Sequence, residues 1–308
     1  MKPAERVELT VPPGAAGRRL DVWLAEALGI GSRARIQKLL DGGHVLVDGM
    51  PRSKGFRLAG GERVDADLAE PAAPPAPAAA HPRIAWEDEH LMVVDKPPGL
   101  VVHPAPGHRS VTLVELLADR AGTSWQPLVV HRLDRNTSGL MLVAKLEPIQ
   151  SALREAIRRR EVLREYLVLV KGRLDARAGT IDAPIGRDVR RRTRMSTRTD
   201  KPRAARTHFT VERFIDGFTL ARARLETGRT HQIRAHFAAA GYVVCGDREY
   251  GGSGILALER QFLHSAQLAF THPATGEHID QTSDLPEDLA AALDRAQQRR
   301  GNIMSPRR

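Results

Sequence analysis

The sequence is poor in cysteine, in aromatic residues and in long apolar runs. Cys245 is its single cysteine, which excludes an internal disulfide and a cysteine-based zinc site. Apolar runs such as residues 91–94 are far shorter than the roughly twenty residues that a membrane span needs. The N-terminal residues also lack the apolar segment of a signal peptide. We therefore expect a cytoplasmic protein with no membrane partner.

Aromatic residues make up 4% of the chain, too few for the long stacking platforms that bind single-stranded nucleic acids. Positive charge, in contrast, is in excess: 47 Lys and Arg against 37 Asp and Glu give a formal net charge of +10. Such a surplus favours a polyanionic partner. A hydrophobic content of 42% excludes a disordered chain.

The 308 residues are enough for two domains. Residues 69–82 are almost only Pro and Ala. Such a segment cannot pack and is typical of an extended connector, so we place the domain boundary within it. The last residues are basic and lack periodicity, which predicts a frayed tail. The expected order is an N-terminal extension (1–16), a small module (17–68), a linker (69–82), a larger domain (83–294) and a basic tail (295–308).

The small module has two helical patterns and a hairpin signal. Leu20, Trp23 and Leu24 have helical spacing, Ser32 can cap a second helix, and Asp48-Gly49 is typical of a tight turn between strands. The pattern over residues 19–49 resembles the S-four-type RNA-binding module, a small α/β unit. That resemblance makes Arg33, Arg35 and Lys38 candidate phosphate contacts, although solvated helix faces explain their charge equally well.

The larger domain alternates strand and helix patterns without a regular βαβ rhythm. Two strands are expected around the turn at 87–89, two more on either side of a polar loop at 132–138, and a helix from 148 is followed by a strand to 172. This order predicts an α+β fold whose mixed, largely antiparallel sheet has flanking helices.

The polar loop carries Asp134 between Arg132 and Arg135. Two adjacent guanidinium groups are expected to keep the carboxylate ionised, and a charged loop that leaves an apolar strand is a usual place for a catalytic group. A turn whose Asp and Asn bond to their own backbone is the structural alternative, and on the loop alone it is favoured.

A second polar segment, residues 225–241, predicts a helix capped by Thr230 and stopped by Gly241, with Arg234 near its start. This arrangement offers positive potential to an anion. A zinc site at His231 and His236 is disfavoured, because residues five apart do not share a helix face and no metalloprotease Glu lies between them.

The window 187–206 holds nine Lys and Arg against two Asp, a charge of +7. We interpret it as a loop that contacts an RNA backbone, with Arg190, Arg191 and Arg192 as candidate phosphate contacts; a merely solvated loop is the alternative.

Tyr166, one of three tyrosines, lies in a strand pattern, where half-buried core is its ordinary role.

Together, these motifs closely resemble the RluA-type family of pseudouridine synthases, in the branch that modifies large-subunit ribosomal RNA. The signature is HRLDRNTSGL at 131–140, and the supporting matches are DKPPGL at 95–100, Arg164-Glu165-Tyr166, GRTHQIRAH at 228–236 and GDREYG at 246–251. The resemblance implies the pseudouridine-synthase fold and the isomerisation of uridine to pseudouridine within RNA, without a cofactor or metal.

By this resemblance Asp134 is the catalytic carboxylate, as nucleophile or as base, and Arg234 is its ion-pair partner. Tyr166 would stack on the extruded uracil and Arg132 would fill the space that the base leaves. Leu140 is expected in the pocket wall. We expect a monomer that binds RNA, with ribosomal RNA preferred over transfer RNA as substrate. The other alternative is a catalytically inactive RNA-binding or ribosome-assembly protein of the same fold.

Overall fold

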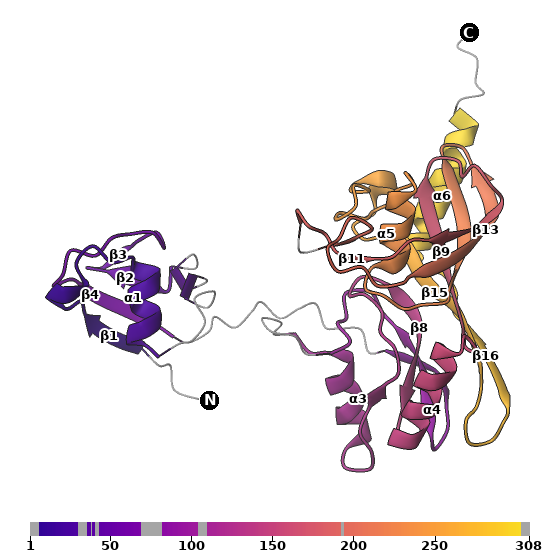
Figure 1. Ribbon diagram of the computed structural model, residues 1–308, viewed down its shortest axis with the longest axis horizontal. Helices are drawn as coiled ribbons and strands as arrows, with labels where there is room; N and C mark the ends of the chain where they lie inside the picture. Colours follow the sequence, from indigo (N-terminus) through magenta and orange to yellow (C-terminus); the bar gives the residue numbers. More distant parts are fainter. Residues whose placement is uncertain are drawn as a thin grey trace, which may run out of the picture. The chain divides into compact units, whose positions relative to one another are not determined.

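The chain was analysed as a computed structural model that describes residues 6–29, 36–37, 39–40, 43–68, 82–103, 110–191 and 194–302 (Figure 1). It divides into two units, Met1–Ala76 and Pro77–Arg308. Within the described ranges, no helix has both the length and the apolar character that a membrane crossing requires.

In the first unit, a helix and the helical residues 36–37 and 39–40 accompany a four-stranded antiparallel sheet. The helix is α1 (Leu20–Ala27), and the strands lie in the order β1 (Arg6–Thr10), β4 (Arg63–Asp67), β2 (Val45–Val47) and β3 (Met50–Pro51). A 3₁₀ turn, η1 (Pro13–Ala15), follows β1. The expected helix at Leu20 and the hairpin at Asp48-Gly49 are confirmed. Ile36, Leu39 and Leu40 are buried in this core, whereas Ser32 lies outside the described residues.

The second unit is built on a ten-stranded sheet of the described residues. In spatial order its main path is β10 (Ala178–Asp182), β13 (Arg206–Ile215), β14 (Phe218–Leu225), β9 (Leu163–Lys171), β15 (Leu263–Thr271), β8 (Ser138–Ala144), β6 (Leu91–Lys96) and β5 (Arg83–Glu87). The strand β16 (His278–Thr282) pairs with β15, and β7 (Leu128–Val129) pairs with β8.

Only the β15–β8 pair within this sheet is parallel, so the predicted mixed, largely antiparallel α+β fold is confirmed. The two strands meet where Gly139 lies beside Ser265. A Cβ atom on Gly139 would lie 2.2 Å from the Ser265 carbonyl oxygen, and the backbone there has φ 106°, so the close approach requires glycine.

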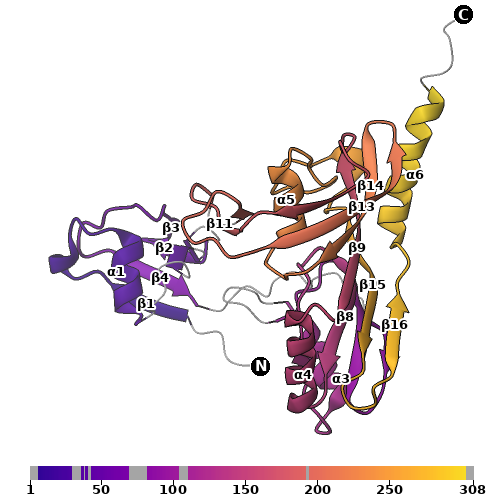
Figure 2. The same ribbon diagram turned by 45° about the vertical axis from the view of Figure 1, so that its right-hand side comes forward.

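Helices cover both halves of the sheet (Figures 1 and 2). The helices α3 (Leu113–Ala121) and α4 (Glu147–Arg158) lie near β8, while α5 (Gln232–Ala239) and α6 (Glu287–Asn302) lie near β13. A capping box between Thr112 and Glu115 starts α3. The apolar positions Ile149 and Leu153 of α4 are buried, and its arginines face away from them.

Two boundaries predicted from the sequence are wrong. Thr230 does not cap α5; the cap is His231 in a left-handed conformation with φ 54°, because the Gln232 side chain accepts the hydrogen bonds of Thr227 and of the Arg229 backbone N–H. The basic tail does not begin at 295 either. The helix α6 continues to Asn302, since Ala296 is buried and Arg295 donates to the Leu256 carbonyl.

The basic window 187–206 is also more ordered than predicted. Its start forms a two-stranded hairpin of β11 (Gly186–Arg187) and β12 (Met195–Ser196). Asp188 supplies the missing countercharge: it accepts from the backbone N–H groups of Arg190 and Arg191 and from the side chain of Arg194. Those backbone hydrogen bonds lower the pKa of Asp188 to about 2, so it stays ionised.

Candidate active site

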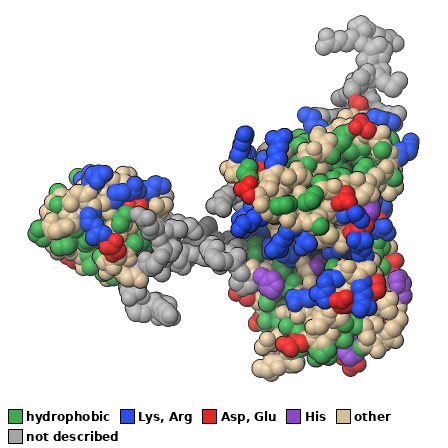
Figure 3. All heavy atoms as spheres, in the orientation of Figure 1, with side chains coloured by type: hydrophobic (Ala, Val, Ile, Leu, Met, Phe, Trp, Pro, Cys, Tyr) green, Lys and Arg blue, Asp and Glu red, His purple; other side chains and the backbone are tan. Residues whose placement is uncertain are grey.

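A cavity of about 450 Å³ opens in the second unit between the polar loop, α4, the start of β9 and the segment before α5. Asp134 and Tyr166 both line it. Its other charged lining is mostly cationic, comprising Arg132, Arg154, Arg158, Arg160, Arg164 and Arg229 against Glu226. Figure 3 shows Lys and Arg side chains gathered in a band across the middle of this unit. The cavity is therefore suited to an anionic ligand.

The loop that carries Asp134 is fixed by side chains from elsewhere in the sheet. Lys96 donates to the Arg135 carbonyl, Arg260 to the Asn136 carbonyl, and Gln261 to the Thr137 hydroxyl. Lys96 is fully buried, and burial lowers its pKa to about 7. These contacts fix the three residues that follow Asp134 and so restrict the position of its carboxylate.

Asp134 pairs with Arg234 of α5, although one hundred positions separate them. The Arg234 Nη1 atom donates to Asp134 Oδ2 at 3.1 Å. The Asp134 side chain is 17% exposed and that of Arg234 is 5% exposed. The carboxylate thus faces the cavity while its guanidinium partner lies behind it.

Arg234 is itself held by two further carboxylates. Its Nε and Nη2 atoms donate to Asp247 at 2.6 and 2.8 Å, and Nη2 also donates to Glu249 at 2.6 Å. Burial opposes the charge of Arg234, but the hydrogen bonds and charges of Asp247 and Asp134 outweigh it and raise its pKa. The guanidinium is therefore a permanent positive charge in a fixed orientation.

The expectation that Arg132 and Arg135 hold Asp134 ionised is wrong. In the described part of the chain, the ion pairs of Asp134 are with Arg234 and, at 3.9 Å, with His231. Arg135 instead donates to the Gly99 carbonyl, and Arg132 lines the open cavity. The partner of Asp134 therefore comes from a helix far along the chain and not from its neighbours in sequence.

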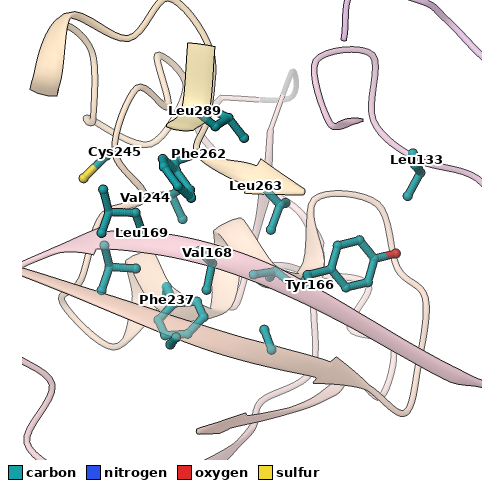
Figure 4. Close-up of a cluster of buried hydrophobic side chains, with 14 of the residues drawn as sticks. Leu133, Tyr166, Val168, Leu169, Phe237, Val244, Cys245, Phe262, Leu263 and Leu289 are labelled. Carbon is teal, nitrogen blue, oxygen red and sulfur yellow. The ribbon is translucent and has the colours of Figure 1, made fainter. Parts of the chain in front are cut away.

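Tyr166 is 4% exposed and lies at the cavity end of the main core cluster. Figure 4 shows it on the same strand as Val168 and Leu169, with its ring at the margin of the packed side chains. Burial raises the pKa of Tyr166, so its hydroxyl stays protonated at neutral pH. The ring is thus both a core residue and part of the cavity wall.

Leu140 does not line the cavity, contrary to the sequence prediction. Alternation along β8 places Leu140 and Leu142 in a core cluster with Leu91 and Ile149, whereas Met141 and Val143 pack in the main cluster with Tyr166. The side chain of Leu140 therefore faces away from Tyr166.

Sequence reasoning gave no role to several residues that the structure brings to the site. Asp247 and Glu249 lie in the GDREYG motif, which supported the family resemblance without a role for either residue. The motif was therefore a signal that could have identified them. His231 lines the cavity, and burial lowers its pKa. Tyr250 stacks on Arg234 with 5.1 Å from the guanidinium carbon to the ring centre. It also bonds to the backbone of Met195 in the basic hairpin.

Only some of the candidate phosphate contacts lie among the described residues. Arg190 and Arg191 are exposed on the hairpin of β11 and β12. Arg33, Arg35, Lys38 and Arg192 lie outside the described residues.

Comparison with known families gives two matches in this chain. The model described as RNA pseudouridylate synthase matches residues 90–239, which include Asp134, Tyr166 and Arg234. The model described as S4 domain matches residues 18–64, within the first unit.

Similar proteins match most of the length of this chain. The chain is 41% identical over 301 residues to ribosomal large subunit pseudouridine synthase D of Nitrosomonas europaea, covering 93% of this chain and 87% of that protein. It is 38% identical to the uncharacterized RNA pseudouridine synthase YlyB of Bacillus subtilis, over 94% of this chain and 97% of the relative. Human RNA pseudouridylate synthase domain containing 4 has a similar structure, with TM-score 0.57, 25% identity, and coverage of 69% and 92%.

Proposed function

The chain belongs to the RNA pseudouridylate synthase family, and we propose that it converts uridine in large-subunit ribosomal RNA with Asp134 as its catalytic carboxylate. The observation that carries the assignment of Asp134 is its ion pair with the buried Arg234 at the wall of a cationic cavity. No other carboxylate among the described residues combines a place in this cavity with such a partner.

The reaction is an isomerisation within one nucleoside. The bond from uracil N1 to the ribose is broken, the base turns, and C5 is joined to the same sugar carbon, so the reaction needs neither a redox partner nor a group donor. Attack on the sugar and removal of a ribose proton both require an ionised carboxylate. Arg234 stabilises that form at the wall of the cavity.

A base inside folded RNA must leave its stack to reach this cavity, which costs a few kcal/mol. We assign Tyr166 as the ring on which the extruded uracil stacks, because its ring forms the apolar wall beside Asp134. Arg132 is assigned to the space that the base leaves, since it is the exposed cation next to the catalytic loop. All of these residues come from one chain, so a monomer suffices.

Several similar proteins bear the name ribosomal large subunit pseudouridine synthase D. This shared name supports large-subunit ribosomal RNA as the substrate and the cytoplasm as the place of action. Mapping pseudouridine in total RNA from cells with and without the gene tests it. Loss of a site in large-subunit RNA is expected, whereas loss only in transfer RNA would refute this substrate.

Asp134→Asn tests the catalytic assignment. We expect the rate of pseudouridine formation to fall roughly 10³-fold or more, while RNA binding persists because the cationic lining is unchanged. Asp119→Asn, which neutralises an exposed carboxylate of α3, is the matched control and should keep the wild-type rate. A fully active Asp134→Asn enzyme would show that another group performs the chemistry.

A further inference from the structure

Arg164 is a buried arginine with few partners. It is the second residue of β9 and is 3% exposed. Its Nη2 atom donates to the carbonyl oxygens of Leu225 and Glu226 at 3.3 and 3.4 Å, near the limit of a hydrogen bond, and its Nε atom has no partner. Among the described residues, no carboxylate forms an ion pair with it.

Such a group is costly for the folded protein. A buried charge is ordinarily compensated by an ion pair and by hydrogen bonds to every donor. Arg164 has no ion pair, and its Nε donor has no hydrogen bond. Burial lowers the pKa of Arg164 without preventing its protonation. A cost of this kind is expected where the missing negative charge arrives with a ligand.

The position of Arg164 indicates where that negative charge would be. It lines the same cavity as Asp134 and lies two residues before Tyr166, hence on the same face of β9. Gly228 faces it across the cavity wall, and a Cβ atom there would lie 2.9 Å from the Arg164 Nη1 atom. The glycine thus leaves room for the guanidinium beside the ring that we assign to the extruded base.

Isomerisation of uridine creates a negative charge at this place. When the N1–C1′ bond breaks, its electron pair leaves with the base, so the detached uracil is an anion with charge delocalised over N1 and the two carbonyl oxygens. The charge disappears when C5 bonds to C1′, the C5 proton is lost and N1 gains a proton. Atoms and electrons balance within the nucleoside, and the anion exists only during the reaction.

We propose that Arg164 is a further catalytic residue, whose guanidinium charge lies beside the extruded uracil and stabilises the detached base. This inference rests on the proposed site at Asp134. Exposed arginines at the cavity rim, such as Arg158 and Arg160, are the ones that reach RNA phosphates, because their side chains are 69% and 58% exposed. A fixed donor in a buried site, aimed at charge that develops during the reaction, is worth far more than the same group in water.

The test compares Arg164→Met and Arg164→Lys in single-turnover reactions with enzyme in saturating excess over RNA. We expect the methionine variant to be about 10²-fold slower, with an RNA Kd within about threefold of wild type, and the lysine variant to keep part of the rate. Arg222→Met is the matched control, since Arg222 lies on β14 outside the cavity and pairs with Glu165 and Glu212.

Chemical rescue separates a catalytic from a structural role. Guanidinium ions added to Arg164→Ala should raise its rate in a saturable manner and leave Asp134→Asn unaffected. Wild-type rates in the Arg164 variants, or a defect confined to RNA affinity and its salt dependence, would overturn the proposal; the second outcome would assign a phosphate contact instead.

Gly228→Ala gives an independent test should the Arg164 variants fail to fold. The added methyl group must displace the guanidinium without removing its charge, and we expect the single-turnover rate to fall about tenfold. An unchanged rate would contradict the inference. The proposed function fails separately, since it is lost if Asp134→Asn is active, whatever the Arg164 variants do.

Discussion

Two buried arginines lie close to one cavity, Arg164 in its wall and Arg234 behind Asp134, and their surroundings are opposite. Arg234, on α5 behind Asp134, contacts three carboxylates: Asp134, Asp247 and Glu249. Arg164, on β9 beside Tyr166, contacts two carbonyl oxygens at long distance and leaves its Nε atom unpaired. The same side chain is thus compensated in one region and uncompensated in the other.

The difference indicates which negative charge each arginine stabilises. Arg234 stabilises negative charges that the protein always carries, so these charges compensate its burial in the folded state. Arg164 has no such partner, and its compensation would come only from a substrate. The free energy of unfolding should therefore respond in opposite ways to replacement of the two arginines.

The largest effect is expected for Arg234→Met. Removing the guanidinium leaves Asp247 buried without its ion-pair partner, and the loss of a buried partner typically costs about 3–5 kcal/mol. Urea denaturation of the variant and wild type measures the free energy of unfolding. A loss below about 1 kcal/mol would mean that the carboxylates find other partners and that the contrast with Arg164 is false.

The pKa of His131 should report the charge of Arg164 at acidic pH. Burial and, to a smaller extent, the charge of Arg164 together lower the pKa of His131 from 6.5 to about 3. The unfolded state then takes up the proton first, so the stability that His131 contributes above pH 6.5 is lost as pH falls toward 3, by about 1.4 kcal/mol per pH unit. NMR titration should find a higher pKa for His131 in Arg164→Met.

His264 provides the control for this titration. Its pKa is also lowered by burial, but Arg164 is not among the groups that affect it. The pKa of His264 should therefore be the same in wild type and Arg164→Met. An equal pKa for His131 in both proteins would show that the charge of Arg164 is screened.

A smaller effect of opposite sign is expected for the stability of Arg164→Met. Replacing an uncompensated buried charge with an apolar side chain of similar length should leave the free energy of unfolding unchanged or raise it by about 1 kcal/mol. Thermal denaturation at neutral pH checks the sign. Strong destabilisation would mean that the two long hydrogen bonds to Leu225 and Glu226 compensate the charge.

The smallest effect is expected for exposed arginines. The double variant of Arg190→Gln and Arg191→Gln should lower the salt slope of RNA binding by about one to two and leave the single-turnover rate unchanged, because these side chains are solvated in the free protein. A variant that neutralises the exposed Arg213 and Arg224 removes the same charge elsewhere. Equal slopes in the two variants would contradict specific contacts at the hairpin.

Much of the fold could be predicted because local patterns were strong. Strands in residues 83–96, the helix α4 and the strand β9 follow from apolar periodicity and breakers such as Pro97-Pro98-Gly99. Predictions failed where particular side-chain contacts decide the local structure. Gln232 fixes the turn before α5 by accepting from Thr227 and Arg229, and Asp188 orders part of the basic window by accepting backbone hydrogen bonds.

The candidate site divides in the same way. The motifs identified Asp134, Tyr166 and Arg234, yet they assigned Leu140 to the pocket, while the alternation of β8 places it on the other face. Neither the pairing of Asp247 with Arg234 nor the unpaired Nε atom of Arg164 could be foreseen, because burial and pairing depend on strands and helices that meet only in three dimensions.

By itself, the sequence determined the kind of chemistry. The motifs at 131–140, 228–236 and 246–251 and the S-four-type pattern depend on residue type and order, and their resemblance to known families predicts an enzyme that acts on RNA. Tertiary structure alone decided which charges are compensated. Coulomb energy depends on distance and on exclusion of water, and both are set when β8, β9 and α5 bring their residues to one cavity.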